Sequence, residues 1–239
     1  MYKEKKILAI IPARGGSKGL PGKNIKEIAG LPLIVWTIKN ALAADIIDNI
    51  VVSTDCEEIA KISIDSGASV PFLRPEELAR DSSPSIDAIT YTINELAKQG
   101  KSYDIVALLE PTSPLRKKED LNNALSSFID NYEEHNSVCS VGEIHLESPF
   151  ITKTIVGNKL QDLVKHENII TQRQDYPLAF FPYGVIYASK IEYVLNNNKV
   201  YDSQSMPYLI ERWQNYEIDD VFDFLCVESI LKLKNKEIL

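Results

Sequence analysis

The chain has 239 residues, 44% of them hydrophobic and 25% charged, which is enough for one substantial core but hardly for two full domains. Its net charge of −8 argues against nucleic-acid binding in general, because that needs a basic face to neutralise phosphates. The charged start and the short apolar run at 7–12 lead us to expect neither a signal sequence nor a membrane span. The three cysteines lack metal-ligand spacing, so we expect a reduced, cytoplasmic setting.

Strand-like and helix-like segments alternate along the chain. Short apolar runs predict strands at 6–11, 50–53, 69–73, 105–109, 137–141 and 184–188. Apolar residues at helical spacing, with charged or polar starts, predict helices at 32–44, from about 57, at 85–98, 118–128 and 221–232. Thr54 or Asp55 can cap the second of these helices. Strands that are apolar on both sides predict an α/β fold of three layers, a mainly parallel sheet with helices on both faces.

The alternation breaks down between residues 145 and 182. This stretch contains short apolar pairs, polar segments and a turn signal at Gly157-Asn158. We therefore expect a single domain over residues 1–239, with 145–182 forming a small inserted arm.

The loop at residues 13–24, directly after the first predicted strand, is rich in glycine and in basic side chains. Glycines let backbone N–H groups approach an anion, and the cations supply charge for a polyphosphate. The loop is not a Walker A motif, since Asn24 rather than Ser or Thr follows Lys23, and it contains no GxGxxG. A solvated basic loop is the alternative, but so much glycine and charge after a buried strand favours phosphate binding.

Ligands of such folds bind beyond the carboxyl ends of the strands. That rule places residues 13–24, 53–55 and 110–116 at one edge of the predicted sheet. Glu110 should point into the crevice, while the hydroxyls of this segment and Arg116 could orient a sugar or a phosphate. The alternative for 110–116 is a rigid connection in which Thr112 or Ser113 caps a helix.

The acidic segment Glu217-Ile218-Asp219-Asp220 precedes the last predicted helix. If it is extended, Glu217 and Asp219 face the same side and could hold Mg²⁺ against phosphate oxygens. Asp220 would face away and could cap the helix, although an ordinary acidic first turn is the alternative reading. Arg173 on the arm could bind an anionic substrate or simply be solvated. The three histidines are isolated, so we expect no histidine-based metal or triad chemistry.

Taken together, these segments resemble the acylneuraminate cytidylyltransferases, the CMP-sialic acid synthetase family. The matching motifs are IPARGGSKG (11–19), PGKN (21–24), VSTD (52–55), RPEELA (74–79) with Asp81 and Ser85, PTSPLR (111–116), QRQ (172–174) and EID (217–219). They run in family order over nearly the whole chain.

The resemblance implies transfer of CMP from CTP to the anomeric hydroxyl of an acidic nine-carbon sugar, with Mg²⁺ as cofactor and pyrophosphate as the second product. The nucleotide would be bound by Ala13, Arg14, Ser17, Lys18, Lys23, Asn24, Ser83 and Ser85. The sugar would be bound by Glu110, Thr112, Ser113, Arg173 and Tyr183, and the metal by Glu217 and Asp219. Catalysis would rest on Arg14, Lys18, Lys23 and Asp219. Members of the family are typically homodimers whose arm reaches the partner's active site.

Three positions depart from the family pattern. Glu110 stands where sialic-acid enzymes typically have Gln, FPYG (181–184) stands for Arg-Pro-Asn-Gly, and Glu217 stands for Asp. We therefore expect a related nonulosonic acid, such as a legionaminic-type sugar, rather than N-acetylneuraminate. The alternatives are a 3-deoxy-manno-octulosonate cytidylyltransferase, a nucleoside-diphosphate-sugar pyrophosphorylase or a non-catalytic nucleotide-binding module.

Overall fold

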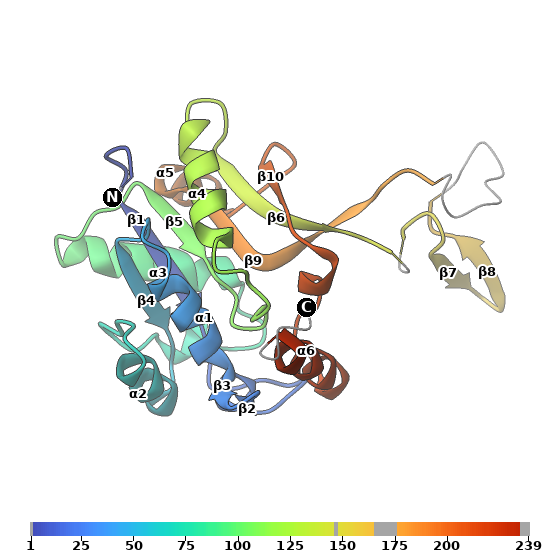
Figure 1. The fold of residues 1–239 in the computed structure, drawn as a ribbon, viewed down its shortest axis with the longest axis horizontal. Helices are drawn as coiled ribbons and strands as arrows, with labels where there is room; N and C mark the ends of the chain where they lie inside the picture. Colours follow the sequence, from blue (N-terminus) through green and yellow to red (C-terminus); the bar gives the residue numbers. More distant parts are fainter. Residues whose placement is uncertain (1, 146–147, 165–175, 235–239) are drawn as a thin grey trace.

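A central sheet with helices on both sides forms the body of the molecule in the computed structural model, which describes residues 2–145, 148–164 and 176–234 (Figure 1). The strands of this sheet lie in the order β10-β6-β9-β5-β1-β4. Their bounds are β1 (Ile7–Pro12), β4 (Asn49–Ser53), β5 (Ile105–Leu108), β6 (Ser137–Glu143), β9 (Phe180–Lys190) and β10 (Met206–Leu209). No helix in these residues is both long and apolar enough to cross a membrane.

The predicted mainly parallel sheet is confirmed, with one exception among the described strands. β1 runs parallel to β4 and β5, and β10 runs parallel to β6. β9 is antiparallel to both of its neighbours, β5 and β6. β6 leads out of the sheet toward the projection in Figure 1 and β9 returns from it, which gives the two strands opposite directions.

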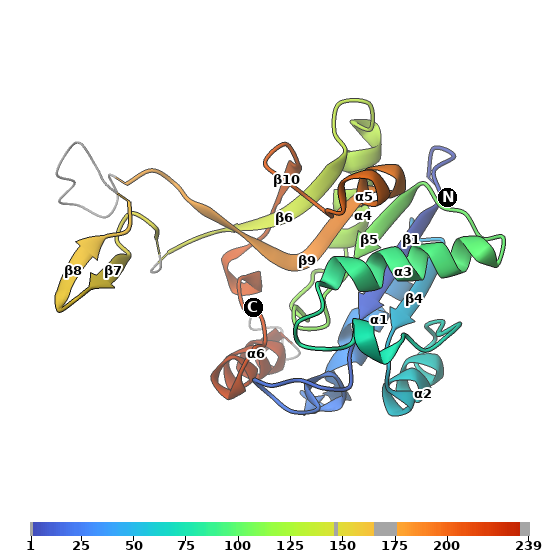
Figure 2. The ribbon, with the colours of Figure 1, turned by 180° about the vertical axis from the view of Figure 1, so that it is seen from behind.

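Helices cover the two faces, as predicted, because the strands are apolar on both sides. On one face lie α1 (Leu33–Leu42), α2 (Glu57–Asp65) and α4 (Asp120–Asp130), and on the other lie α3 (Ser85–Lys98) and α5 (Ile191–Asn197) (Figures 1 and 2). The alternation is visible along β1. Ile7, Ala9 and Ile11 join the core under α1 and α4, whereas Leu8 and Ile10 join the core under α3.

A third apolar cluster attaches α6 (Val221–Lys234) beside the first loop. Phe224 and Val227 of α6 pack with Leu20 and Leu33, close to the short strands β2 (Glu27–Ile28) and β3 (Leu31–Pro32). Ile218, directly before the helix, is fully buried in the same cluster. This packing fixes the acidic segment against the glycine-rich loop, although the two are far apart in the sequence.

Two local predictions are wrong. Residues 69–73 form no strand, only a single bridge between Val51 and Ser69, because Pro71 lacks the N–H that a ladder needs. Neither predicted cap serves α2, whose N-cap is Cys56 without a side-chain hydrogen bond. Asp55 instead accepts a hydrogen bond from the backbone N–H of Gly15 (3.0 Å), so its carboxylate belongs to the first loop.

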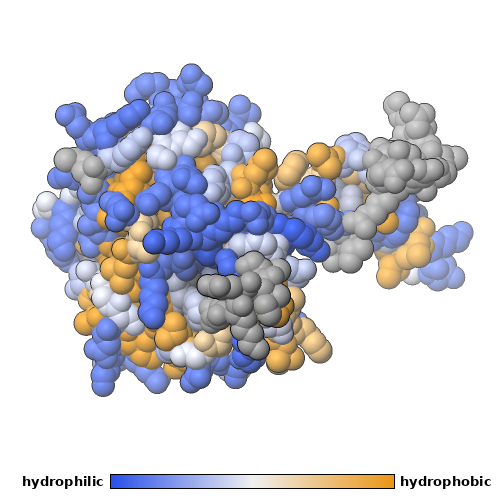
Figure 3. All heavy atoms as spheres, viewed as in Figure 1, coloured by the Kyte–Doolittle hydropathy of each residue, from blue (hydrophilic) through white to orange (hydrophobic). Residues whose placement is uncertain are grey.

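The stretch predicted as an arm contains a hairpin of β7 (Lys153–Val156) and β8 (Lys159–Asp162), joined at the predicted turn Gly157-Asn158. All eight strand residues are exposed. Figure 3 shows the hairpin region standing away from the body of the molecule, with apolar side chains on its surface. That 145–182 serves as a dimerisation arm remains a prediction.

Candidate active site

A cleft of about 300 Å³ opens beyond the carboxyl ends of β1 and β5. Its walls come from the loop after β1, the segment between β4 and α3, the segment after β5 and the acidic segment before α6. The lining residues are Pro12, Arg14, Ser17, Lys23, Asn24, Arg74, Leu78, Arg80, Asp81, Ser83, Ser85, Glu110, Pro111, Thr112 and Asp219. The predicted placement of the first and third segments at one edge of the sheet is therefore correct, and residues 53–55 adjoin them through Asp55.

Most of the residues predicted to bind nucleotide, sugar or metal line this cleft. Arg14, Ser17, Lys23, Asn24, Ser83, Ser85, Glu110, Thr112 and Asp219 are among the lining residues. Ala13 is fully buried, and its N–H donates to the carbonyl of Ser53 (2.9 Å). Ser113 and Glu217 bond to each other outside the lining, and Tyr183 lies on β9. Arg173 lies outside the described residues.

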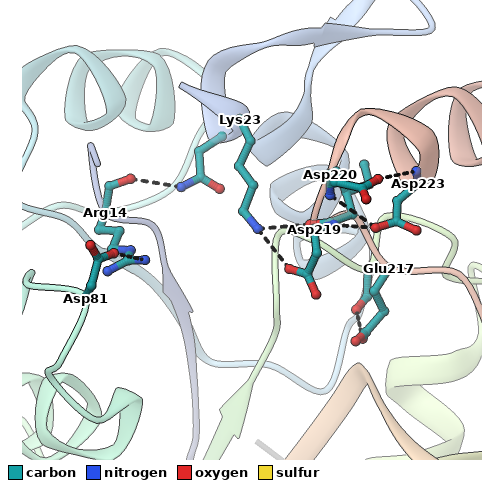
Figure 4. A network of polar contacts seen from close by, with 10 residues as sticks. Arg14, Lys23, Asp81, Glu217, Asp219, Asp220 and Asp223 are labelled. Atoms are coloured by element: carbon teal, nitrogen blue, oxygen red, sulfur yellow. Dashed lines mark hydrogen bonds and ion pairs between the residues drawn. The ribbon is translucent and has the colours of Figure 1, made fainter. Parts of the chain in front are cut away.

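Asp81 draws two cations of the first loop together. Its carboxylate pairs with Arg14 Nη2 at 2.7 Å and with Lys18 Nζ at 2.9 Å (Figure 4 shows the Arg14 pair). The hydrogen bond from Lys18 is the main reason why the pKa of Asp81 lies below its usual value. Asn24 donates to the carbonyl of Arg14 (3.0 Å) and thereby fixes the loop from inside. These contacts hold the loop in shape, with Arg14 and Lys23 lining the cleft and Lys18 exposed beside Asp81.

Arg74, the first residue of the RPEELA motif, also lines the cleft. Its guanidinium is buried, Nη2 lies 3.6 Å from Asp55 Oδ1, and burial lowers its pKa. Within the described residues, Nε and Nη2 make no hydrogen bond. Buried donors are normally satisfied, and Nη2 has the Asp55 carboxylate within ion-pair range, so Nε is the donor that a ligand at this wall could use. In the sequence, the only sign of this role is an arginine directly before Pro75.

Lys23 joins the first loop to the acidic segment. Its Nζ donates to the carbonyl of Ile218 (2.9 Å) and to Asp219 Oδ1 (3.2 Å) (Figure 4). Gly19 passes so close that a Cβ there would lie 2.2 Å from the carbonyl oxygen of Asp219. Asp220 accepts hydrogen bonds from the N–H groups of two residues of α6, which is the predicted cap. The carboxylate of Asp219 therefore stands at the cleft, 87% exposed.

Arg116 does not point into the cleft, so the expectation that it could orient a ligand is wrong. The side chain is buried, and all five of its N–H groups are used within the protein. The acceptors are the carbonyls of Glu110, Ser113, Gly184 and Val185 and the hydroxyl of Thr37. Arg116 is therefore the internal brace between the segment after β5 and strand β9.

A second cavity of about 340 Å³ adjoins the first and shares two lining residues with it, Ser85 and Glu110. Its remaining walls are Ile86, Ile89, Leu108, Tyr187, Lys199, Val200 and Tyr201. The rings of Tyr187 and Tyr201 stack at 4.9 Å. Glu110 therefore stands between two different cavities. The first has basic side chains that suit a polyphosphate, and the second is lined by aromatic, aliphatic and basic groups.

Burial raises the pKa of Glu110 to about 7, and the nearby Glu217 carboxylate adds to the shift. In the unfolded chain this carboxyl titrates about 2 to 3 pH units lower, so ionising it in the folded protein costs stability as the pH rises toward 7. We expect Glu110→Gln, which carries no charge to bury, to be more stable than the wild type by about 3 kcal/mol above pH 7.

The measurement for this prediction is a pair of thermal unfolding curves without nucleotide, one at about pH 5 and one at about pH 8.5. The gain in Tm of Glu110→Gln should be larger at the higher pH. Glu143→Gln, an exposed glutamate at the end of β6, is the matched control and should show no such pH dependence. An equal gain at both pH values would mean that Glu110 is not held above its usual pKa.

Comparisons with known proteins identify the family of this chain. A family model described as Cytidylyltransferase matches residues 8–229. The CMP-N,N'-diacetyllegionaminic acid synthase of Legionella pneumophila is 34% identical over 98% of this chain and 99% of its own length. The pseudaminic acid cytidylyltransferase of Campylobacter jejuni strain 81-176 is 31% identical over 97% of this chain and 98% of its own. The N-acylneuraminate cytidylyltransferase of Escherichia coli is 30% identical over 97% of this chain, which spans 54% of that protein.

Solved structures show the same fold. A CMP:2-keto-3-deoxy-manno-octonic acid synthetase complexed with CTP superposes with a TM-score of 0.71 at 17% identity, covering 97% of this chain and 99% of that one. A 4-diphosphocytidyl-2C-methyl-D-erythritol synthase superposes with a TM-score of 0.66 at 12% identity, covering 95% and 99%. The family model and the nearly full-length relatives confirm the resemblance seen in the motifs, and the chain belongs to the cytidylyltransferase family.

Proposed function

We propose that the chain transfers CMP from CTP to the anomeric hydroxyl of a nonulosonic acid and releases pyrophosphate. The observation that carries this proposal is the pair of adjoining cavities that share Ser85 and Glu110. One is lined by the basic loop and suits a triphosphate, and the other suits a sugar with apolar substituents. The relatives named for legionaminic and pseudaminic acids support a sugar of this class.

The nucleotide half rests on the cations at the cleft. Arg14 and Lys23 line it, and Lys18 forms an ion pair with Asp81, which lines it too. A triphosphate bound there would meet these charges together with the N–H groups of the glycine-rich loop. By the resemblance, Ser83, just before α3, and Ser85, its first residue, would lie near the cytosine and the ribose. The Nε donor of Arg74, on the same wall, offers a further contact for the nucleotide.

The groups at the cleft fit a magnesium ion that would be held jointly by protein and substrate. In the described part of the chain no cluster of three or more acidic, histidine or cysteine side chains could hold a metal alone. Mg²⁺ commonly binds to one or two carboxylates and completes its shell with phosphate oxygens and water. Asp219 provides such a carboxylate at the cleft, whereas one oxygen of Glu217 already accepts two hydrogen bonds. When bound, the ion would neutralise charge on the phosphates.

The reaction needs alignment rather than a covalent nucleophile. The anomeric oxygen forms a bond to the α-phosphorus, the bond from that phosphorus to the bridging oxygen breaks, and pyrophosphate leaves. The cations of the loop stabilise the charge that develops. The proton of the hydroxyl must go to a base, and Glu110 lies between the two cavities with a pKa of about 7, close to working pH. We assign this role to Glu110.

The acceptor half is supported by the second cavity. Lys199 can attract the acid's carboxylate, and the rings of Tyr187 and Tyr201 with Ile86 offer an apolar wall to N-acyl groups. Thr112 lines the shared opening. Arg173 and Tyr183, predicted to bind sugar, stay in the proposal without further support. The departures from the sialic-acid pattern favour a legionaminic-type acceptor.

The proposal includes a cytoplasmic homodimer in which the arm at 145–182 contacts the partner. Its support is the exposed apolar surface of the hairpin, where Ile155 is 74% and Leu160 72% exposed. Surface of this kind is typical of an interaction site.

The acceptor is tested by incubating the protein with CTP, Mg²⁺ and a panel of purified acids while following pyrophosphate. The panel holds N,N'-diacetyllegionaminic acid, pseudaminic acid, N-acetylneuraminate and 3-deoxy-manno-octulosonate. We expect the highest kcat/KM with a legionaminic-type acid. A clear preference for N-acetylneuraminate would overturn the legionaminic-type acceptor but not the nonulosonic acid class. Activity with 3-deoxy-manno-octulosonate alone would overturn that class, while the transfer of CMP from CTP would still stand.

A further inference from the structure

Glu217 lies at a junction of three chain segments that are distant in the sequence. Its Oε1 accepts hydrogen bonds from Ser113 Oγ, in the segment after β5, and from the backbone N–H of Gly184, on β9. Glu217 itself belongs to the segment before α6. Figure 4 shows its carboxylate turned away from Lys23, toward which the Asp219 carboxylate points.

The junction directly supports the residue that stands between the two cavities. A Cβ on Gly184 would lie 2.5 Å from Glu110 Cγ and 2.8 Å from Ser113 Oγ, so these three residues are in close contact. Arg116 Nη2 donates to the carbonyls of Glu110 (2.9 Å) and Gly184 (2.7 Å) in the same region. The segment after β5, which begins with Glu110, is therefore held against strand β9 by Arg116 and by Glu217.

We propose that Glu217 is a positioning residue for the acceptor side of the site, and that Asp219 serves the metal without it. This inference rests on the proposed function and departs from the predicted role of Glu217 as a metal ligand. An oxygen that already accepts two hydrogen bonds from fixed donors is poorly placed for the octahedral geometry of Mg²⁺. Glu217 also lies outside the lining of the cleft, which includes Asp219.

Changing either the length or the charge of the Glu217 side chain distinguishes a positioning residue from a metal ligand. Glu217→Asp keeps a carboxylate but draws it back by about 1.5 Å, so it should lose both bonds of the junction. Glu217→Gln keeps an oxygen at the same reach, which can accept both bonds, but removes the negative charge that a metal ligand needs. A metal ligand should therefore tolerate Asp better than Gln, and a positioning residue should tolerate Gln better than Asp.

The experiment measures three quantities in each variant, namely KM for the acceptor, KM for CTP and the Mg²⁺ concentration that gives half-maximal activity. We expect Glu217→Asp to raise the acceptor KM about tenfold or more, because Glu110 shifts, with the other two quantities unchanged. Glu217→Gln should stay within about threefold of the wild type in all three. Asp219→Asn, the positive control, should raise the Mg²⁺ requirement.

Thermal unfolding of each variant shows whether it is folded. Should Glu217→Asp fail to fold, Ser113→Ala removes one donor of the junction without touching a carboxylate, and it should raise the acceptor KM with the Mg²⁺ requirement unchanged. The inference is overturned if Glu217→Gln raises the Mg²⁺ requirement about tenfold or more while Glu217→Asp does not. A wild-type protein that releases no pyrophosphate with any acid would instead overturn the proposed function.

Discussion

Replacing Asp219 by asparagine is expected to lower kcat for CMP transfer about 1,000-fold, with little change in Tm. The side chain is 87% exposed at the cleft, and within the described part of the chain its carboxylate bonds only to Lys23, so the fold depends little on it. Asparagine keeps the shape and removes the charge that a divalent ion requires. The rate of pyrophosphate release under saturating CTP and acceptor measures the effect.

The matched control for this variant is Asp65→Asn on α2, an exposed aspartate outside the lining of the cleft. It should keep wild-type kcat, because it removes one surface charge without touching the site. Raising the Mg²⁺ concentration should restore part of the activity of Asp219→Asn. Wild-type kcat in Asp219→Asn at ordinary Mg²⁺ would show that this carboxylate neither binds the metal nor aligns the phosphates.

Replacing Arg116 by alanine is expected to lower the free energy of unfolding by about 4 kcal/mol and Tm by about 10 °C. The guanidinium is buried and bonds to carbonyls on two chain segments, so its removal leaves several buried acceptors without a donor. Burial lowers the pKa of Arg116 to about 10, which still leaves it charged at neutral pH. Arg116→Lys should be nearly as damaging, since one ammonium cannot reach all these acceptors.

Arg212→Ala tests whether the loss belongs to the buried brace rather than to any arginine. Arg212 is exposed, lies on a 3₁₀ turn (Arg212–Gln214) and contacts the ring of Tyr216. Its removal should change the free energy of unfolding by less than about 1 kcal/mol. Calorimetric unfolding of both variants measures the difference. A fully stable Arg116→Ala with lost CTP binding would return Arg116 to the role of a ligand contact.

Local pattern was enough to predict the parts of the fold that are held by burial. β1 and β5 are short apolar runs, and each is buried on both faces, so the three-layer arrangement followed from their composition alone. The rule for carboxyl ends of strands then placed the basic loop and Glu110 at one edge of the sheet, where the structure has them.

Contacts between distant segments account for what the pattern did not predict. Arg116 reads as a ligand contact until its partners are known, and one of these, Val185, lies 69 positions away. Glu217 and Asp219 stand two positions apart, the spacing expected of a pair of metal ligands on an extended segment. In the structure, however, the Glu217 carboxylate accepts a hydrogen bond from Ser113, which lies 104 positions earlier. β9 is antiparallel to its neighbours because it returns from the projection. The pattern of apolar residues within a strand does not indicate the direction in which the strand runs.

The most direct test of cytidylyl transfer to a sugar acid is the identity of the product. The purified protein, Mg²⁺, N,N'-diacetyllegionaminic acid and one nucleoside triphosphate at a time would be analysed by mass spectrometry and by ³¹P NMR. Of the nucleoside triphosphates, we expect only CTP to react. It should give an adduct of CMP and the acid with a phosphodiester signal, together with an equal amount of pyrophosphate. An adduct formed from UTP or GTP in preference to CTP, or hydrolysis of CTP without any adduct, would contradict the proposed function.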